Sequence, residues 1–210
     1  MINHVMINQG FSASLRDFLP EGSVEIVSEW LVNYKISLKI VRERNTKLGD
    51  YRCPSSLKGH RISVNGNMNP YSFLITLVHE MAHLLVWEKY RGKVYPHGKE
   101  WKQTYADLIL EFISARVFPY DVHVVLENSL LKTKANSYGN IKLSRVLKKY
   151  DLKETGSLVE DVPDNTVFKL QNGLTFKKIR KNRIRYRCLC LENKRIYSVH
   201  PLAKVISVLN

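Results

Sequence analysis

Two stretches in the middle of the chain carry apolar residues in helical runs. The longer one begins at Pro70, since proline favours the first helical turn, and it continues to about Tyr90 before Gly92 ends the pattern. The second spans about residues 99–115, and a shorter helix follows a turn near Pro119. The longer run is strongly apolar, which predicts a helix buried in the core.

Before these helices, apolar and polar residues alternate, and this alternation predicts strands at about 36–44, 50–54 and 61–65. Residues 8–35 are predicted to be helical, with an interruption at residues 20–22. Helices combined with a small three-stranded sheet indicate an α+β fold for residues 1–131.

A polar stretch at 132–140 and a short basic helix at 141–150 follow. We therefore assign 132–154 to a basic linker with a short helix, and 155–210 to a small basic β module. Turn signals at Asn172-Gly173 and at 192–194 separate its strands. The strands are expected at about 167–170, 174–179, 184–191 and 195–199.

The composition is typical of a soluble globular protein, with 44% hydrophobic and 25% charged residues. No apolar stretch reaches transmembrane length, and the first residues lack the basic-then-apolar pattern of a secretion signal. Cys53, Cys188 and Cys190 are too few and too unevenly placed for a disulfide framework. The sequence thus predicts a cytoplasmic protein with reduced thiols and no membrane partner.

An H-E-x-x-H sequence, from His79 to His83, lies inside the long apolar helix. Residues four apart share one face of a helix, so the two histidines can bind one metal ion, with Glu80 beside them as a proton acceptor. Two imidazoles and a carboxylate suit zinc, which keeps an open position in catalytic sites. The alternative interpretation is a pair of core histidines satisfied by hydrogen bonds.

A catalytic zinc needs a third protein ligand. His97 follows a loop that contains glycine and proline, and it precedes the second helix, from where it can fold back onto the first. Trp101 can pack against the metal helix from the same segment. The rival ligands are carboxylates of the second helix: Glu100, Asp107 and Glu111. We favour His97, and Glu111 is the better of the carboxylates.

The motif, its 13-residue spacer and the following His97-Gly98-x-x-Trp101 resemble the SprT-like domain. That domain is the metallopeptidase of the Spartan proteases, which act on DNA–protein crosslinks, and of their bacterial relatives. Segments 44–52 and 61–65 are similar to the family's hairpin and to the strand ahead of its metal helix. The resemblance covers about residues 20–115.

The resemblance implies a zincin-like metallopeptidase domain that cleaves proteins bound to DNA, and hence a role in DNA–protein crosslink repair. It also implies one catalytic zinc ion, with Glu80 as the base and three ligands: His79, His83 and His97. Some members carry a C-terminal zinc ribbon with paired Cys-x-x-Cys knuckles. This chain departs from that pattern, because Cys188 and Cys190 are one residue too close and only His200 is near them.

Charge is distributed unevenly along the chain. Residues 1–131 hold 15 basic and 13 acidic side chains, whereas residues 132–210 hold 18 basic and 6 acidic ones. The densest run predicts contacts with nucleic acid, and DNA is favoured. Its basic residues are Lys177, Lys178, Arg180, Lys181, Arg183, Arg185 and Arg187. On a strand, the last three would form one ladder of positive charge for phosphates. The alternatives are a solvated hairpin that keeps the protein soluble and an acidic protein partner.

The expected reaction is peptide hydrolysis, in which Glu80 takes a proton from zinc-activated water and delivers it to the leaving nitrogen. A protein substrate would lie extended along a strand edge near the metal helix. Tyr95 and His123 are the candidates for an oxyanion donor. The alternative function is a nucleic-acid-binding module with a structural zinc and no protease activity.

Overall fold

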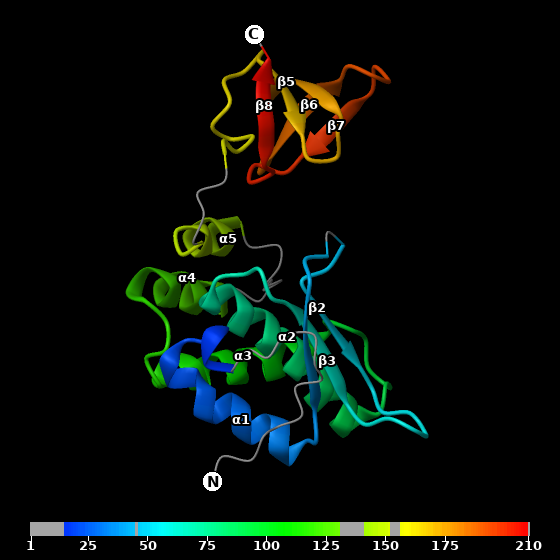
Figure 1. Cartoon of the computed structure of the whole chain (residues 1–210), viewed down its shortest axis with the longest axis vertical. Helices are drawn as coiled ribbons and strands as arrows, with labels where there is room; N and C mark the ends of the chain where they lie inside the picture. Colours follow the sequence, from blue (N-terminus) through cyan, green and yellow to red (C-terminus); the bar gives the residue numbers. More distant parts are fainter. Residues whose placement is uncertain (1–14, 45, 131–140, 152–155, 210) are drawn as a thin grey trace. The chain divides into compact units, whose positions relative to one another are not determined.

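The computed structural model describes residues 15–44, 46–130, 141–151 and 156–209 of the 210-residue chain. The chain divides into two compact units, Met1–Asp151 and Leu152–Asn210, and each has its own hydrophobic core. The first unit combines helices with a three-stranded sheet, and the second is built on a five-stranded sheet (Figure 1). The described residues therefore form an α+β structure.

The central element of the first unit is helix α2 (Pro70–Tyr90). Its start is fixed by Asn69, whose side chain accepts a hydrogen bond from the Ser72 amide at 2.9 Å, and proline occupies the first turn. Every residue from Phe73 to Ala82 is buried, which explains the strongly apolar sequence. The helix ends at Arg91, whose left-handed backbone (φ 49°) accords with the end predicted before Gly92.

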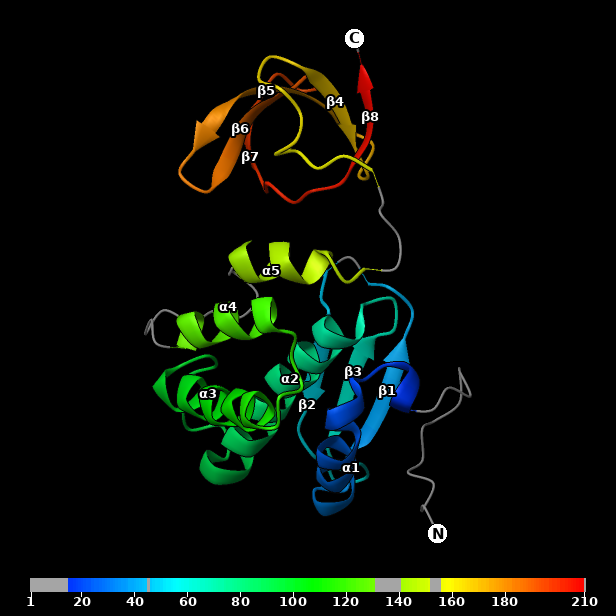
Figure 2. The same cartoon turned by 90° about the vertical axis from the view of Figure 1, so that its left-hand side faces the viewer.

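A three-stranded sheet packs on one side of α2. It consists of β1 (Ser37–Val41), β2 (Gly49–Arg52) and β3 (Arg61–Asn65) in the order β1-β3-β2. β1 runs parallel to β3, and β2 runs antiparallel to it. Helix α3 (Lys99–Ser114) packs on the other side of α2, so α2 lies between the sheet and α3 (Figure 2). All three strands and both helices were predicted near these positions.

Shorter helices complete the first unit. Two 3₁₀ turns (Leu15–Asp17 and Glu21–Ser23) precede α1 (Val24–Asn33), where a helix with an interruption was predicted. Residues 8–14 of that prediction lie outside the described residues. Helix α4 (Tyr120–Leu130) follows α3. None of the described helices has the length and apolar character needed to span a membrane.

Helix α5 (Ile141–Lys148) belongs to the first unit, where the sequence suggested part of a linker. Its Leu143 and Leu147 are buried in the same core as α2. The boundary expected at residue 131 is therefore too early, because an amphipathic helix beyond it completes the core. The polar stretch 132–140 lies outside the described residues.

The second unit is an antiparallel sheet in the order β7-β6-β5-β4-β8. Four strands follow one another as a meander: β4 (Val167–Leu170), β5 (Thr175–Asn182), β6 (Arg185–Cys190) and β7 (Ile196–Val199). The fifth strand, β8 (Val205–Leu209), returns to pair with β4, and the sequence prediction missed it. Phe168, Phe176, Cys188 and Cys190 are buried together on the inner side of the sheet.

Candidate functional site

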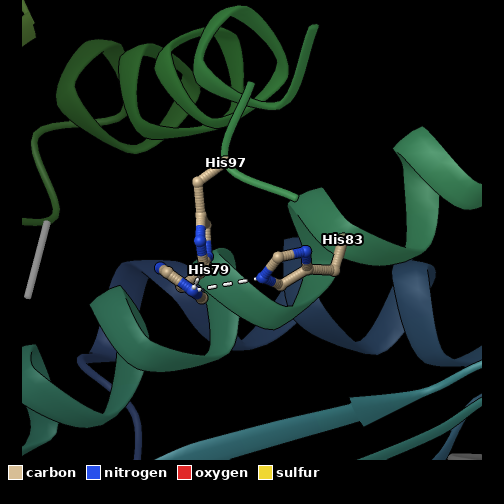
Figure 3. Close-up of side chains that lie close together, drawn as sticks. All are labelled: His79, His83 and His97. Carbon is tan, nitrogen blue, oxygen red and sulfur yellow. Dashed lines mark hydrogen bonds between the residues drawn. The ribbon is translucent and has the colours of Figure 1, made fainter. Parts of the chain in front are cut away.

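Three histidine rings meet beside α2 (Figure 3). His79 and His83 project from the same face of the helix, and His97 approaches from the segment before α3. The Nε2 atom of His79 lies 3.3 Å from Nε2 of His83 and 3.1 Å from Nε2 of His97. One ligand atom from each ring lies within 4.8 Å of the others, so the three side chains could hold a metal ion.

A tight turn brings His97 back onto α2. The Gly98 amide donates to the Tyr95 carbonyl at 3.0 Å, and Pro96 supplies the fixed φ angle that the second position of such a turn favours. His97 adopts a left-handed backbone (φ 57°) at the third position. A Cβ on Gly98 would lie 2.9 Å from the Tyr95 carbonyl, so glycine is needed where α3 begins.

Trp101 fixes the orientation of the three rings. It is buried, and its ring centroid lies 4.6 Å from that of His79, 5.3 Å from that of His83 and 4.7 Å from that of His97. Tyr105, one turn later on α3, stacks on the same indole at 5.1 Å. The expected packing of Trp101 against the helix that carries His79 and His83 is confirmed, and α3 thereby holds the cluster together.

The surroundings of the cluster keep its imidazoles neutral. Burial, together with the neighbouring rings of His83 and His97, lowers the pKa of His79 to about 3. Burial and His97 lower the pKa of His83 to about 4. Burial and the charge of Lys102 also lower the pKa of His97. A neutral imidazole offers the lone pair that metal coordination requires.

The side chain of Glu80 projects from α2 and is buried against the edge strand β2. Burial, helped by the negative charge of Asp50, raises its pKa to about 7. The backbone amide of Tyr51 donates a hydrogen bond to the carboxylate, and this bond together with the charges of Arg44 and Lys47 opposes the rise. A carboxyl group that titrates near neutrality is suited to exchange protons with a substrate or with water.

The rival third ligands do not join the histidines in the described part of the chain. Asp107 is exposed and accepts a hydrogen bond from Gln103 at 2.8 Å, and Glu111 is exposed on α3. Glu100 lies 3.8 Å from Lys99. Of the two suggested oxyanion donors, Tyr95 is exposed in the turn before His97, and His123 faces Glu127 on α4 at 3.7 Å.

The basic residues of the run in the second unit do not share one face of the sheet. Lys177, Arg180, Arg185 and Arg187 lie on the outer face of the sheet, opposite the buried Tyr186 and Cys188. Arg183 occupies the turn between β5 and β6 with a left-handed backbone (φ 54°). The prediction that Arg183, Arg185 and Arg187 form one ladder is therefore wrong, because Arg183 lies in the β5–β6 turn and not on the strand.

The prediction that Lys178 contacts nucleic acid is also wrong, because its side chain is buried and not available to phosphates. Its ammonium group donates to the carbonyls of Val159, at 3.0 Å, and Val162, and it lies 3.9 Å from the centre of the Tyr186 ring. These contacts satisfy a buried charge inside the core of the unit. Lys181 is exposed near the same ring, at 5.9 Å.

Sequence reasoning missed the residues of β2 that contact Glu80. A Cβ at Gly49 would lie 2.5 Å from Oε1 of Glu80. At position 49 the strand therefore approaches the helix more closely than a residue with a side chain would allow. The available signal was a glycine at the start of a short strand, which often marks such an approach. Lys169 was also missed: it is exposed and pairs with Thr175, which places it on the outer face beside Lys177.

Known proteins are similar to this chain in the region that contains the three histidines and Glu80. The sequence model of the SprT-like family matches residues 32–117. Protein SprT of Cronobacter sakazakii is 31% identical over 131 residues, which cover 55% of this chain and 74% of that protein. Protein SprT of Enterobacter sp. (strain 638) is 29% identical over 129 residues, which cover 60% and 72% respectively. No solved structure matches the chain. With the matched region spanning the histidine cluster, Glu80 and β2, the chain belongs to the SprT-like family.

Proposed function

We propose that the first unit is a zinc metallopeptidase with a zincin-like arrangement of helices on a small sheet. The observation that carries the proposal is the convergence of His79, His83 and His97, and the buried Glu80 directly follows the first of them in the sequence. Three nitrogen ligands with one open position are typical of catalytic zinc sites. In this proposal His97, and not a carboxylate of α3, is the third ligand.

The spacing of the imidazoles fits zinc. Tetrahedral zinc with Zn–N bonds of about 2.0–2.1 Å places neighbouring ligand nitrogens about 3.3–3.4 Å apart. The Nε2 atom of His79 lies 3.3 Å from that of His83 and 3.1 Å from that of His97. Nitrogen ligands from neutral imidazoles suit zinc better than magnesium or calcium, which bind through oxygen.

When bound, zinc would lower the pKa of water and polarise a peptide carbonyl. The protein then has two tasks. Glu80 accepts the proton of the attacking water, and its pKa of about 7 allows it to return that proton to the leaving nitrogen. β2 forms one edge of the three-stranded sheet beside Glu80, so an extended substrate could add to it through main-chain hydrogen bonds.

Substitution of Glu80 by Gln tests this function against a module with a structural zinc. Glu80→Gln leaves the histidines in place, so we expect full zinc content and a loss of peptide cleavage by about 100-fold or more. Glu127→Gln, on exposed α4, is the matched control and should retain activity. The substrate is a protein bound to DNA, assayed with and without the nucleic acid. Cleavage that survives in Glu80→Gln contradicts the mechanism, and an inactive wild type favours the binding module.

We further propose that the second unit binds nucleic acid, DNA before RNA, through the outer face of its sheet. Arg180 pairs directly with Arg187, and like charges opposite each other destabilise a sheet unless an anion compensates them. Two acidic residues of this unit have other partners: Asp164 lies 3.8 Å from Lys178, and Glu192 accepts hydrogen bonds from Thr175 and Cys190. The face is completed by Lys169, Lys177 and Arg185.

The salt dependence of binding tests this second proposal. Each phosphate contact to duplex DNA contributes about 0.9 to the slope of log K against log salt concentration. The double variant Lys177→Ala/Arg187→Ala should therefore bind more weakly and lower that slope by about 2. Lys39→Ala removes an exposed charge from β1 in the first unit and is the control. An unchanged affinity and slope in the double variant would exclude the outer face as the binding surface.

A further inference from the structure

The carboxyl group of Glu80 is confined by the backbone of β2. At Gly49, a Cβ would lie 2.5 Å from Oε1 and 2.8 Å from Cγ of Glu80, and 2.9 Å from Cγ2 of Thr76. Contacts below 3.0 Å force one of the partners to move. Because Thr76 and Glu80 are one turn apart on α2, the strand lies directly against this stretch of the helix. A side chain at position 49 would therefore displace the carboxylate.

Tyr51 makes two polar contacts through different groups, one with Glu80 on α2 and one with His60 just before β3. Its backbone amide donates to the Glu80 carboxylate. Its hydroxyl group lies 3.0 Å from Nδ1 of His60, and the two rings stack with their centroids 5.9 Å apart. One residue thus carries both the hydrogen-bond donor to Glu80 and the side chain that fixes where this donor stands.

His60 extends the connection back to α2. Its Nε2 lies 2.9 Å from Oε1 of Glu88, two turns beyond Glu80 on the same helix. Arg91 donates to both oxygens of Glu88, at 3.1 and 3.0 Å, so that carboxylate is itself held in place. His60 is only 8% exposed, and the edge of its ring contacts Trp87. The strand is therefore joined to the helix at Glu80 and again at Glu88.

We infer that Gly49 and the Tyr51–His60–Glu88 chain position the carboxylate of Glu80 for proton transfer. The inference rests on the proposed peptidase function, and it assigns positioning roles to residues outside the histidine cluster. A general base must stay within hydrogen-bond reach of the proton it takes. Hydrogen bonds fix a direction as well as a distance, which apolar packing of β2 on α2 would not do.

Two substitutions separate positioning from folding. Tyr51→Phe removes the hydroxyl group and keeps the ring and the backbone amide. We expect kcat to fall about tenfold, with KM and zinc content unchanged. Tyr150→Phe is the matched control, because it also removes a tyrosine hydroxyl bound at 2.6 Å, to Asp121 on α4. The control should lower thermal stability without a change in kcat. Equal loss of kcat in both variants, or none in Tyr51→Phe, overturns the inference.

Gly49→Ala is the stronger change, and about a 100-fold loss of kcat is expected, because small misplacements of reacting groups cost that much. In a Glu80→Gln background the same change should have no further effect, since the two residues act through one group. A further loss in the double variant would mean that Gly49 acts by another route.

A crystal structure of zinc-loaded Tyr51→Phe beside the wild type makes the result independent of activity. We expect the Glu80 carboxylate to shift or to occupy more than one conformation, with the three histidines unmoved. If the wild type cleaves nothing, the proposed function fails, yet a displaced carboxylate still supports the positioning role. A Glu80 side chain that stays in place in both Tyr51→Phe and Gly49→Ala overturns it.

Discussion

The side-chain amide of Asn69 donates to Oδ1 of Asp151 at 2.7 Å. The same group also donates to the Leu147 carbonyl at 2.9 Å, while its oxygen caps α2 by accepting from the Ser72 amide. Asn69 is buried, so these bonds form within the core. The end of α5 is thereby attached to the start of α2, and the folded first unit extends beyond the family-matched residues 32–117.

Truncation should reveal this boundary. A chain that ends at residue 151 retains α5, and its first unit should unfold at the temperature of the full-length chain. A chain that ends at residue 131 loses the buried Leu143 and Leu147, each worth about 1.5–3 kcal/mol. We expect its midpoint to fall by about 10 °C or more.

Tryptophan fluorescence monitors this unit selectively, because all three tryptophans (Trp30, Trp87 and Trp101) belong to it. Equal midpoints for the two truncated chains would show that α5 is dispensable. The result also decides which deletion is suitable for nucleic-acid experiments, since removal of residues 132–210 would damage both units.

Removal of His97 should abolish tight zinc binding. His97→Ala leaves two ligands on α2, and a two-coordinate protein site does not hold zinc against a chelator. Glu111→Gln, on the exposed side of α3, should retain one zinc ion per chain. Metal analysis after dialysis against a chelator measures both. Full zinc content in His97→Ala would show that another side chain is the third zinc ligand.

Lys178 should be important for stability and Lys177 should not. Lys178→Met keeps the length of the side chain but leaves the carbonyls of Val159 and Val162 without their donor. Unsatisfied buried groups cost about 1–3 kcal/mol each, so the second unit should lose at least about 2 kcal/mol. Lys177→Met, at an exposed site, should change the stability by less than about 0.5 kcal/mol.

Hydrogen exchange of the β5 and β6 amides reports on the second unit in the full-length chain. Faster exchange is expected in Lys178→Met alone. If both variants exchange as the wild type does, the buried ammonium group contributes nothing to the fold.

The contact between Asp121 and Tyr150 predicts a pH window for stability. The hydrogen bond from Tyr150 lowers the pKa of Asp121 below 3.8, and the same bond raises the pKa of Tyr150 to about 12. A lowered carboxyl pKa stabilises the fold above pH 3.8, and this stabilisation is lost as the pH falls through the folded value. A raised tyrosine pKa stabilises below pH 10, and this stabilisation is lost as the pH rises through about 12.

Tyr150→Phe should therefore melt below the wild type between about pH 5 and pH 9, and the difference should shrink at both extremes. Thermal unfolding followed across this range measures it. A difference that does not depend on pH would assign the effect to packing of Tyr150 against Tyr71, whose rings lie 4.9 Å apart, and not to the hydrogen bond.

The sequence predicted those features that follow from local pattern or from ligand chemistry. Pro70, the apolar run and Gly92 predicted the bounds of α2, and the helix runs from Pro70 to Tyr90 in the structure. His97 was preferred because a histidine after a turn can reach back, and the structure brings it to 3.1 Å from His79.

What escaped prediction depends on contacts between distant segments. The approach of Gly49 to Glu80 joins residues that are 31 positions apart, and a glycine at the start of a strand indicates a close approach without identifying its partner. β8 was missed, and its partner is β4, the strand of this sheet that comes first in the sequence. Lys178 could have been placed correctly, since period-two alternation puts it on the face of the buried Phe176, but clustered charge suggested a solvent-exposed strand.

Because β8 pairs with β4, the sheet of the second unit can be completed only after the last strand has been synthesised. Ribosomes release the chain from its N-terminus, so β4 emerges well before the residues that cover its outer edge. Until Val205–Leu209 has been synthesised, the backbone groups of β4 that face β8 have no partner. A nascent chain stalled before that point would present an unpaired, apolar strand edge to chaperones, while the first unit, complete at Asp151, could already be folded.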